Sequence, residues 1–139
     1  MKLLIFYALC FFSVVFGSIT LEKKKELIKD WLKMMEVHEN DCIKETGITP
    51  NELRNAIMTL MYSDDKKVKC YFKCQHVHLG IFDYDNNFHL EEMIKHFSGI
   101  NEDLAQWCIK KVSTYINLDP CSRIHSFMRC CVYTLFSEK

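Results

Sequence analysis

Cys70, Cys74 and His78 form the pattern in this sequence that comes nearest to a metal site. The three residues recur every four positions, so on a helix they lie along one face, and thiolate and imidazole are ligands that zinc prefers. His76 lies between them. The chain of 139 residues holds eight cysteines, however, and in an oxidising compartment thiols pair with one another instead of binding metal. The chemistry of these residues therefore depends on the compartment.

Two further kinds of motif fall short of the sites they imitate. Asp83, Asp85 and Asn87 begin like a calcium-binding loop. Phe88 stands where such a loop needs glycine and Ile94 where it needs a bidentate carboxylate, so an Asx-rich turn between helices explains these residues better. The six histidines form no His-Glu-x-x-His pattern, and there is no Gly-x-Ser-x-Gly elbow. We predict no metal, no cofactor and no catalytic residues, and hence a protein that is not an enzyme.

The N-terminal segment indicates the compartment. Lys2 precedes an apolar run over residues 3–16 that only Ser13 interrupts, and short side chains follow where a signal peptidase cleaves. About 14 apolar residues span roughly 21 Å as a helix, less than the ~30 Å hydrocarbon core of a bilayer. We therefore predict a signal peptide over residues 1–17 and a secreted, extracellular domain over residues 18–139.

One cysteine leaves with the signal peptide, so the remaining seven include one without a partner. Cys70 and Cys74 lie about 6 Å apart along one helical face, with parallel Cβ directions, and cannot easily bond to each other. Cys121 and Cys130 leave opposite sides of their helix. Cys131 falls on that helix's apolar stripe and is the natural candidate for a buried, unpaired thiol. The alternative is a reactive or intermolecular thiol.

Scarce turn residues mark the ends of the elements that must position these side chains. The chain has only four glycines and two prolines, and 49% of its residues are hydrophobic, which favours an all-α fold. Thr49, Pro50 and Glu52 form a capping box, and Pro120 follows Asp119 in a similar way. The predicted helices cover approximately residues 20–40, 50–61, 64–79, 88–97, 102–116 and 120–135.

The charge balance argues against nucleic acid as a partner. The chain has 18 basic and 18 acidic residues, whereas nucleic-acid binders usually carry a basic excess. Lys23, Lys24 and Lys25 form a basic run, but Glu22 and Glu26 flank it, so we interpret the run as a solvated helix face.

Six cysteines follow a spacing typical of one family. Gaps of 27, 3, 33, 12 and 8 residues separate, in order, Cys42, Cys70, Cys74, Cys108, Cys121 and Cys130. With the predicted signal peptide and helices, this pattern resembles the six-cysteine framework of insect odorant-binding proteins of the pheromone-binding and general odorant-binding type. The resemblance covers the whole mature chain. It implies a compact six-helix, disulfide-stapled domain that encloses an apolar cavity.

The resemblance also implies a disulfide pairing that sequence reasoning alone leaves open. In the family the first cysteine pairs with the third, the second with the fifth and the fourth with the sixth. Here these pairs are Cys42 with Cys74, Cys70 with Cys121 and Cys108 with Cys130. Cys131 departs from the six-cysteine pattern.

The function implied by the resemblance is a secreted carrier that binds odorants, pheromones or fatty-acid-like molecules in an internal cavity and transports them through aqueous fluid. The expected partners are this small hydrophobic ligand and, indirectly, an odorant receptor or a membrane, for a chain that is a monomer or a weak homodimer. One alternative is a salivary, venom or seminal effector on the same scaffold, which would use an exposed Trp107 and an available Cys131. Another is an enzyme that pairs His76 or His78 with a carboxylate.

We expect the cavity to be lined by inward-facing side chains of the converging helices, although core packing explains each of them equally well. The expected ligand-binding residues are Leu53, Ile57, Leu60, Met61, Phe72, Met93, Ile94, Phe97, Val112, Tyr115, Ile124, Phe127 and Met128. The first helix carries a further apolar stripe of Leu27, Ile28, Trp31, Leu32 and Met35. The six histidines motivate a hypothesis of pH-dependent ligand release, and the short tail after Cys130 is a candidate to fold across the opening.

Overall fold

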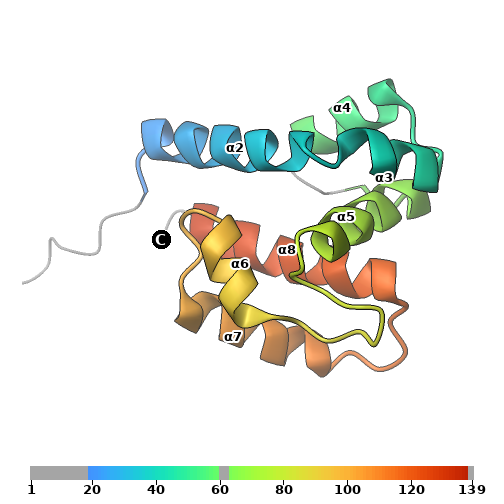
Figure 1. Ribbon diagram of the computed structural model, residues 1–139. Coiled ribbons are helices and arrows are strands. Elements are labelled where there is room, and N and C mark those ends of the chain that lie inside the picture. The colour runs from blue at the N-terminus through green and yellow to red at the C-terminus, as the bar shows by residue number, and fades with distance from the viewer. Residues whose placement is uncertain (1–18, 60–62, 138–139) are drawn as a thin grey trace, which may run out of the picture.

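The computed structural model describes residues 19–59 and 63–137, and within these ranges the chain is all-helical, as predicted (Figure 1). The helices are α2 (Leu21–Glu36), α3 (Glu39–Thr46), α4 (Pro50–Met58), α5 (Lys66–His78), α6 (Leu90–His96), α7 (Glu102–Ser113) and α8 (Pro120–Phe136). The only β pairing among the described residues is an isolated antiparallel bridge between Phe82 and Phe88. The expected signal peptide lies outside the described residues and stays a prediction.

Local capping fixes several helix starts where the sequence predicts them. At α4 the Thr49 hydroxyl accepts from the backbone N–H of Glu52 at 3.2 Å, and the Glu52 carboxylate accepts from the Thr49 N–H at 2.7 Å. The Asn101 side chain caps α7, and the Asp119 side chain caps α8. These side chains satisfy N–H groups that have no partner within the helix.

The structure corrects two expected helices. The helix predicted over residues 20–40 is two helices, because α2 ends at Glu36 and α3 begins at Glu39. The described chain therefore has seven helices instead of six. Neither glycine nor proline marks the break, and its effect is to turn α3 toward α5. The helix predicted over 102–116 ends at Ser113.

Helices α5 and α8 pack closely against each other at the centre of the molecule, with α7 packed against α8 and α6 against α7. In Figure 1, α2 runs across the top of this group, and α3 and α4 lie at one end. Three side chains of α2, Leu27, Trp31 and Met35, are buried. The backbone of α2 does not approach α5 or α8 closely, so α2 is held over these helices mainly by its side chains.

Three disulfides join the helices, in the pairing that the resemblance implies. Cys42–Cys74 links α3 to α5, Cys70–Cys121 links α5 to α8, and Cys108–Cys130 links α7 to α8. Helices α2, α4 and α6 contain no cysteine. The covalent frame therefore fixes one part of the fold and leaves α2 attached by non-covalent contacts.

Cys131 is free and fully buried, as predicted. Burial disfavours the thiolate and raises the pKa of this thiol to about 12. Because the thiolate is the nucleophilic form, the structure argues against a reactive or intermolecular role for Cys131.

Candidate ligand-binding site

An apolar pocket of about 40 Å³ lies between α2 and the helices beneath it. Its lining side chains are Ile28, Trp31, Leu32 and Met35 from α2, Ile57 from α4, Phe72 from α5 and Val132 from α8. A buried water needs about 10–15 Å³ of such volume, so the pocket has room for two or three water molecules. A small organic ligand needs several times more space. The pocket must therefore enlarge before such a ligand enters.

Trp31 is the most firmly positioned wall of this pocket. Its indole Nε1–H donates to the Ser98 carbonyl at 3.0 Å. The indole ring meets Phe97 edge to face at a centroid distance of 5.9 Å and stacks on Phe136 at 5.7 Å. Phe136 is the last residue of α8, so residues 131–136 after Cys130 belong to this helix and its C-terminal end packs against the wall. These contacts hold one end of the pocket closed.

Beneath the pocket, Phe72 is held by a buried histidine. His76 Nδ1 lies 2.6 Å from the Phe72 carbonyl oxygen, so the neutral ring carries its proton on Nδ1 and donates it there. The imidazole stacks on Phe97 at 5.4 Å, and its Nε2 lies 3.0 Å from Met128 Sδ. Burial lowers the pKa of His76 to about 4, and the bond to Phe72 opposes this shift only in part. His76 is therefore a neutral core residue at physiological pH.

Two of the expected ligand-binding residues, Ile57 and Phe72, line the pocket. Others are buried in the core without lining it; these are Leu53, Met93, Phe97, Val112, Ile124, Phe127 and Met128. Ile94 and Tyr115 do not face the interior, because 38% and 43% of their respective surfaces are exposed. Tyr115 lies beyond the end of α7 and lines a surface groove. Leu60 and Met61 lie outside the described residues.

Five of the seven residues that line the pocket are not among the expected ligand-binding residues. Four of the seven lining residues belong to the apolar stripe of α2. The spacing of this stripe predicts that these side chains face inward, but it does not predict that they line a void. Val132 follows Met128 by four residues, so the same periodicity applied to α8 points to it. Amphipathicity alone does not separate these positions from filled core.

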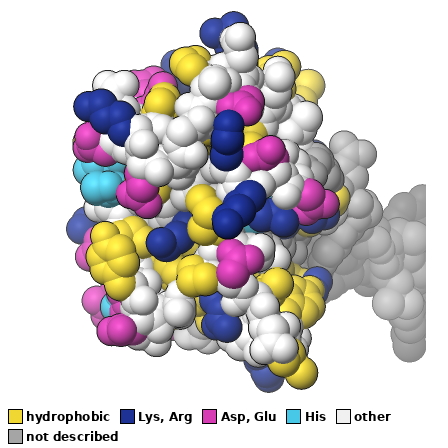
Figure 2. Space-filling view, turned by 90° about the vertical axis from the view of Figure 1, so that its right-hand side faces the viewer, with side chains coloured by type: hydrophobic (Ala, Val, Ile, Leu, Met, Phe, Trp, Pro, Cys, Tyr) yellow, Lys and Arg dark blue, Asp and Glu magenta, His cyan; other side chains and the backbone are white. Residues whose placement is uncertain are grey.

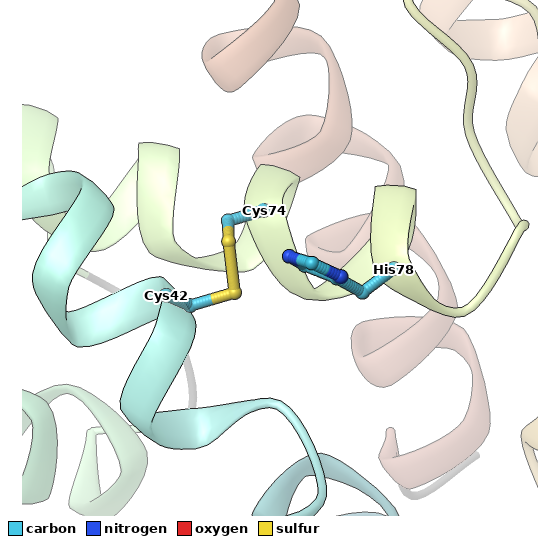
Figure 3. A group of neighbouring side chains, drawn as sticks. All are labelled: Cys42, Cys74 and His78. Atoms are coloured by element: carbon cyan, nitrogen blue, oxygen red, sulfur yellow. A yellow bond between two sulfur atoms is a disulfide. The ribbon is translucent and has the colours of Figure 1, made fainter.

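The metal-like pattern does not fit a metal. Atoms of Cys42, Cys74 and His78 that are able to act as ligands lie within 4.8 Å of one another, and Figure 3 shows the His78 ring beside the two sulfurs. Those sulfurs are bonded to each other, and Cys70 is bonded to Cys121. A disulfide offers no thiolate to bind zinc. The His78 ring instead stacks on His38 at 4.8 Å.

The calcium-like segment is an Asx-rich turn, as predicted. The Asp83 carboxylate accepts from the backbone N–H groups of Asp85 and Asn87, both at 2.9 Å. It also lies 3.0 Å from His89 Nε2. These hydrogen bonds lower the pKa of Asp83, most of all the one from the Asn87 backbone. The carboxylate is thus used to hold the turn together.

A family model described as the PBP/GOBP family matches residues 24–133, which extend from the first turn of α2 into the last turns of α8. The chain belongs to this family. The membership agrees with the resemblance carried by the six cysteines. The pocket described above is thus a feature of a PBP/GOBP protein.

Among curated proteins, the chain is similar to general odorant-binding protein 99a of Drosophila melanogaster. The two are 29% identical over 69 residues, which is 50% of this chain and 48% of the relative. The matched segment therefore spans about half the length of that relative. Separately, none of the described helices combines the length and the apolar character needed to cross a membrane.

Proposed function

We propose that this protein is a secreted carrier that binds small hydrophobic ligands, such as odorants, pheromones or fatty-acid-like molecules, and transports them through aqueous fluid. The observation that carries the proposal is the pocket beneath α2, because apolar side chains alone line it and because α5 and α8, two of the helices that border it, are joined by a disulfide. Membership of the PBP/GOBP family and the name of the Drosophila relative support the same class of function. Burial of the ligand supplies the driving force, at roughly 25 cal/mol per Å² of apolar surface.

Ligand entry requires α2 to move relative to the frame. The disulfides join α3, α5, α7 and α8, whereas α2 carries none and is held mainly by side chains. Met35 and Leu32 are flexible enough to change rotamer around a ligand. A small displacement of α2 therefore enlarges the pocket without breaking a covalent link.

The charge of the surface is compatible with a soluble carrier. On the face shown in Figure 2, Lys and Arg side chains lie among Asp and Glu side chains, and the hydrophobic side chains form separate patches. Neither sign of charge dominates this face. Ligand selection then depends on the interior and its mouth.

The experiment that tests this function is displacement of a fluorescent naphthylamine probe by aliphatic alcohols, esters and acids. The informative variant is Ile57→Phe, which fills part of the pocket, and the matched control is Ile94→Phe, which places the same side chain on the exposed face of α6. We expect the probe to bind the wild type and the control, and to bind Ile57→Phe at least tenfold more weakly. If no apolar compound binds the wild type, the carrier function is wrong.

The second candidate function is a protein-interaction module on the same scaffold. Half of the Trp107 surface is exposed, and Ile116, just beyond the end of α7, is 86% exposed. The ammonium group of Lys111 lies 5.1 Å from the centre of the Trp107 ring, which combines an aromatic anchor with a positive charge. Loss of binding to a protein partner in Trp107→Ala, with no apolar ligand bound by the wild type, would favour this function.

A further inference from the structure

An open groove on the surface of α2 meets the apolar pocket. The groove has a volume of about 570 Å³, and Ile28 and Leu32 line both it and the pocket. These two half-buried side chains therefore mark the place where the pocket reaches the surface. The charged residues along the groove are Lys25, Lys29, Lys33 and Glu36.

The helical geometry of α2 places Lys29 at one side of this mouth, beyond Leu32. Lys29 follows Ile28 directly and precedes Leu32 by three residues, so it lies roughly 60–100° around the helix from both. Its methylene stem can cover their apolar surface while its ammonium group stays in water. Around the circumference of α2, the side chains therefore change from the buried Trp31, through the half-buried Ile28 and Leu32, to the exposed lysines.

The positive charge at this mouth is not balanced within the described part of the chain. Lys25 pairs with Glu22 at 3.3 Å. Lys29 and Lys33 form no ion pair with any residue in 19–59 or 63–137. Glu36 is the one acidic residue that lines the groove. An anionic group at the mouth would therefore meet three lysines against one glutamate, and two of these lysines, Lys29 and Lys33, are not engaged in an ion pair with the described residues.

We propose that this site prefers amphiphiles with one anionic head, and among them long-chain carboxylates. The alkyl chain enters between Ile28 and Leu32, and the carboxylate lies on Lys29 and Lys33. This inference rests on the proposed carrier function and adds the chemical class of the ligand. Because the lysines are exposed, each pair contributes modestly, and we expect an advantage of about three- to tenfold for the acid.

Competition by three ligands of equal chain length tests the preference. Dodecanoate, dodecanol and methyl dodecanoate displace the naphthylamine probe at pH 7.4, first in 20 mM and then in 1 M NaCl. We expect dodecanoate to bind about fivefold more tightly than the other two at low salt, and the advantage to disappear at high salt, where the Debye length falls to about 3 Å. Equal binding of all three at low salt overturns the inference but leaves the carrier function standing, whereas no displacement by any of them overturns both.

Charge variants assign the effect to the groove. Lys29→Gln/Lys33→Gln is expected to lose the preference for dodecanoate while binding dodecanol as the wild type does, which also shows that the pocket is intact. The control Lys66→Gln/Lys110→Gln removes the same charge from α5 and α7, outside the residues that line the groove, and is expected to keep the preference. A preference that survives in Lys29→Gln/Lys33→Gln overturns the inference.

Discussion

The buried His76 makes the stability of the protein sensitive to acid, and the size of the effect follows from its environment. The side chain is 1% exposed, and its pKa is about 4 in the folded protein against 6.5 for the free group. The unfolded chain therefore takes up a proton as pH falls through 6.5, whereas the folded chain does not until pH approaches 4. Stability from this group is fully present above pH 6.5 and is lost between pH 6.5 and 4. The difference of 2.5 in pKa corresponds to about 3 kcal/mol.

Urea unfolding of the disulfide-intact protein at several pH values between 7.5 and 4 measures this loss. The variant His76→Gln cannot titrate, so its free energy of unfolding should fall by about 3 kcal/mol less than that of the wild type over this range. A matched control is His78→Gln, because His78 lies on the same helix with an exposed side chain. This variant keeps His76, so it should keep the loss of stability that His76 causes in acid. Parallel curves for wild type and His76→Gln would refute the reasoning.

The same pKa bears on the hypothesis of pH-dependent ligand release. At pH 5 the folded protein still holds His76 mainly in its neutral form, because its pKa is about 4. A release that is complete at pH 5 would therefore need another titrating group. Equal ligand affinity at pH 7.4 and pH 5 would show that no such group acts.

Three further predictions concern the frame and the helix ends. Replacing Cys70 and Cys121 by serine opens a bridge between residues 51 positions apart, which should cost about 4 kcal/mol in urea unfolding; a cost below about 1 kcal/mol would contradict the chain-entropy account. Cys131 should not react with a water-soluble disulfide reagent in the folded protein, and one thiol should react after denaturation of the chain from residue 18 on; rapid reaction at neutral pH would show that the thiol is accessible. Thr49→Ala removes half of a capping box and should lower the free energy of unfolding by about 1 kcal/mol, whereas Thr134→Ala, at an exposed position inside α8, should not lower it.

Features determined by a few neighbouring residues were predictable from the sequence. The start of α4 was predictable because Thr49 and Glu52 satisfy each other's backbone N–H groups, whatever the rest of the fold does. The break at residues 37–38 was not, because no local stop signal marks it and it depends on how α3 meets α5 through Cys42 and Cys74.

The pocket was harder to predict than the fold. Periodicity identifies Met35, Leu32 and Leu53 alike as inward-facing. The packing of α2 over α5 and α8 then decides that Met35 and Leu32 line a void, whereas Leu53 is part of the filled core. Tyr115 shows a related limit, since its expected position depended on α7 continuing past Ser113. Small differences in where helices end thus decide which side chains reach a site.

Cys130 and Cys131 are neighbours in the chain, yet one forms the bridge to Cys108 and the other stays a free thiol. In the unfolded chain the two thiols are almost equivalent competitors for Cys108. A helix separates them by about 100°, so that one faces α7 and the other the core. The helical form of α8 therefore distinguishes two thiols that the unfolded chain does not, and folding of α8 favours the bridge from Cys130. Once folding is complete, burial suppresses the Cys131 thiolate, and the adjacent bridge is protected from exchange.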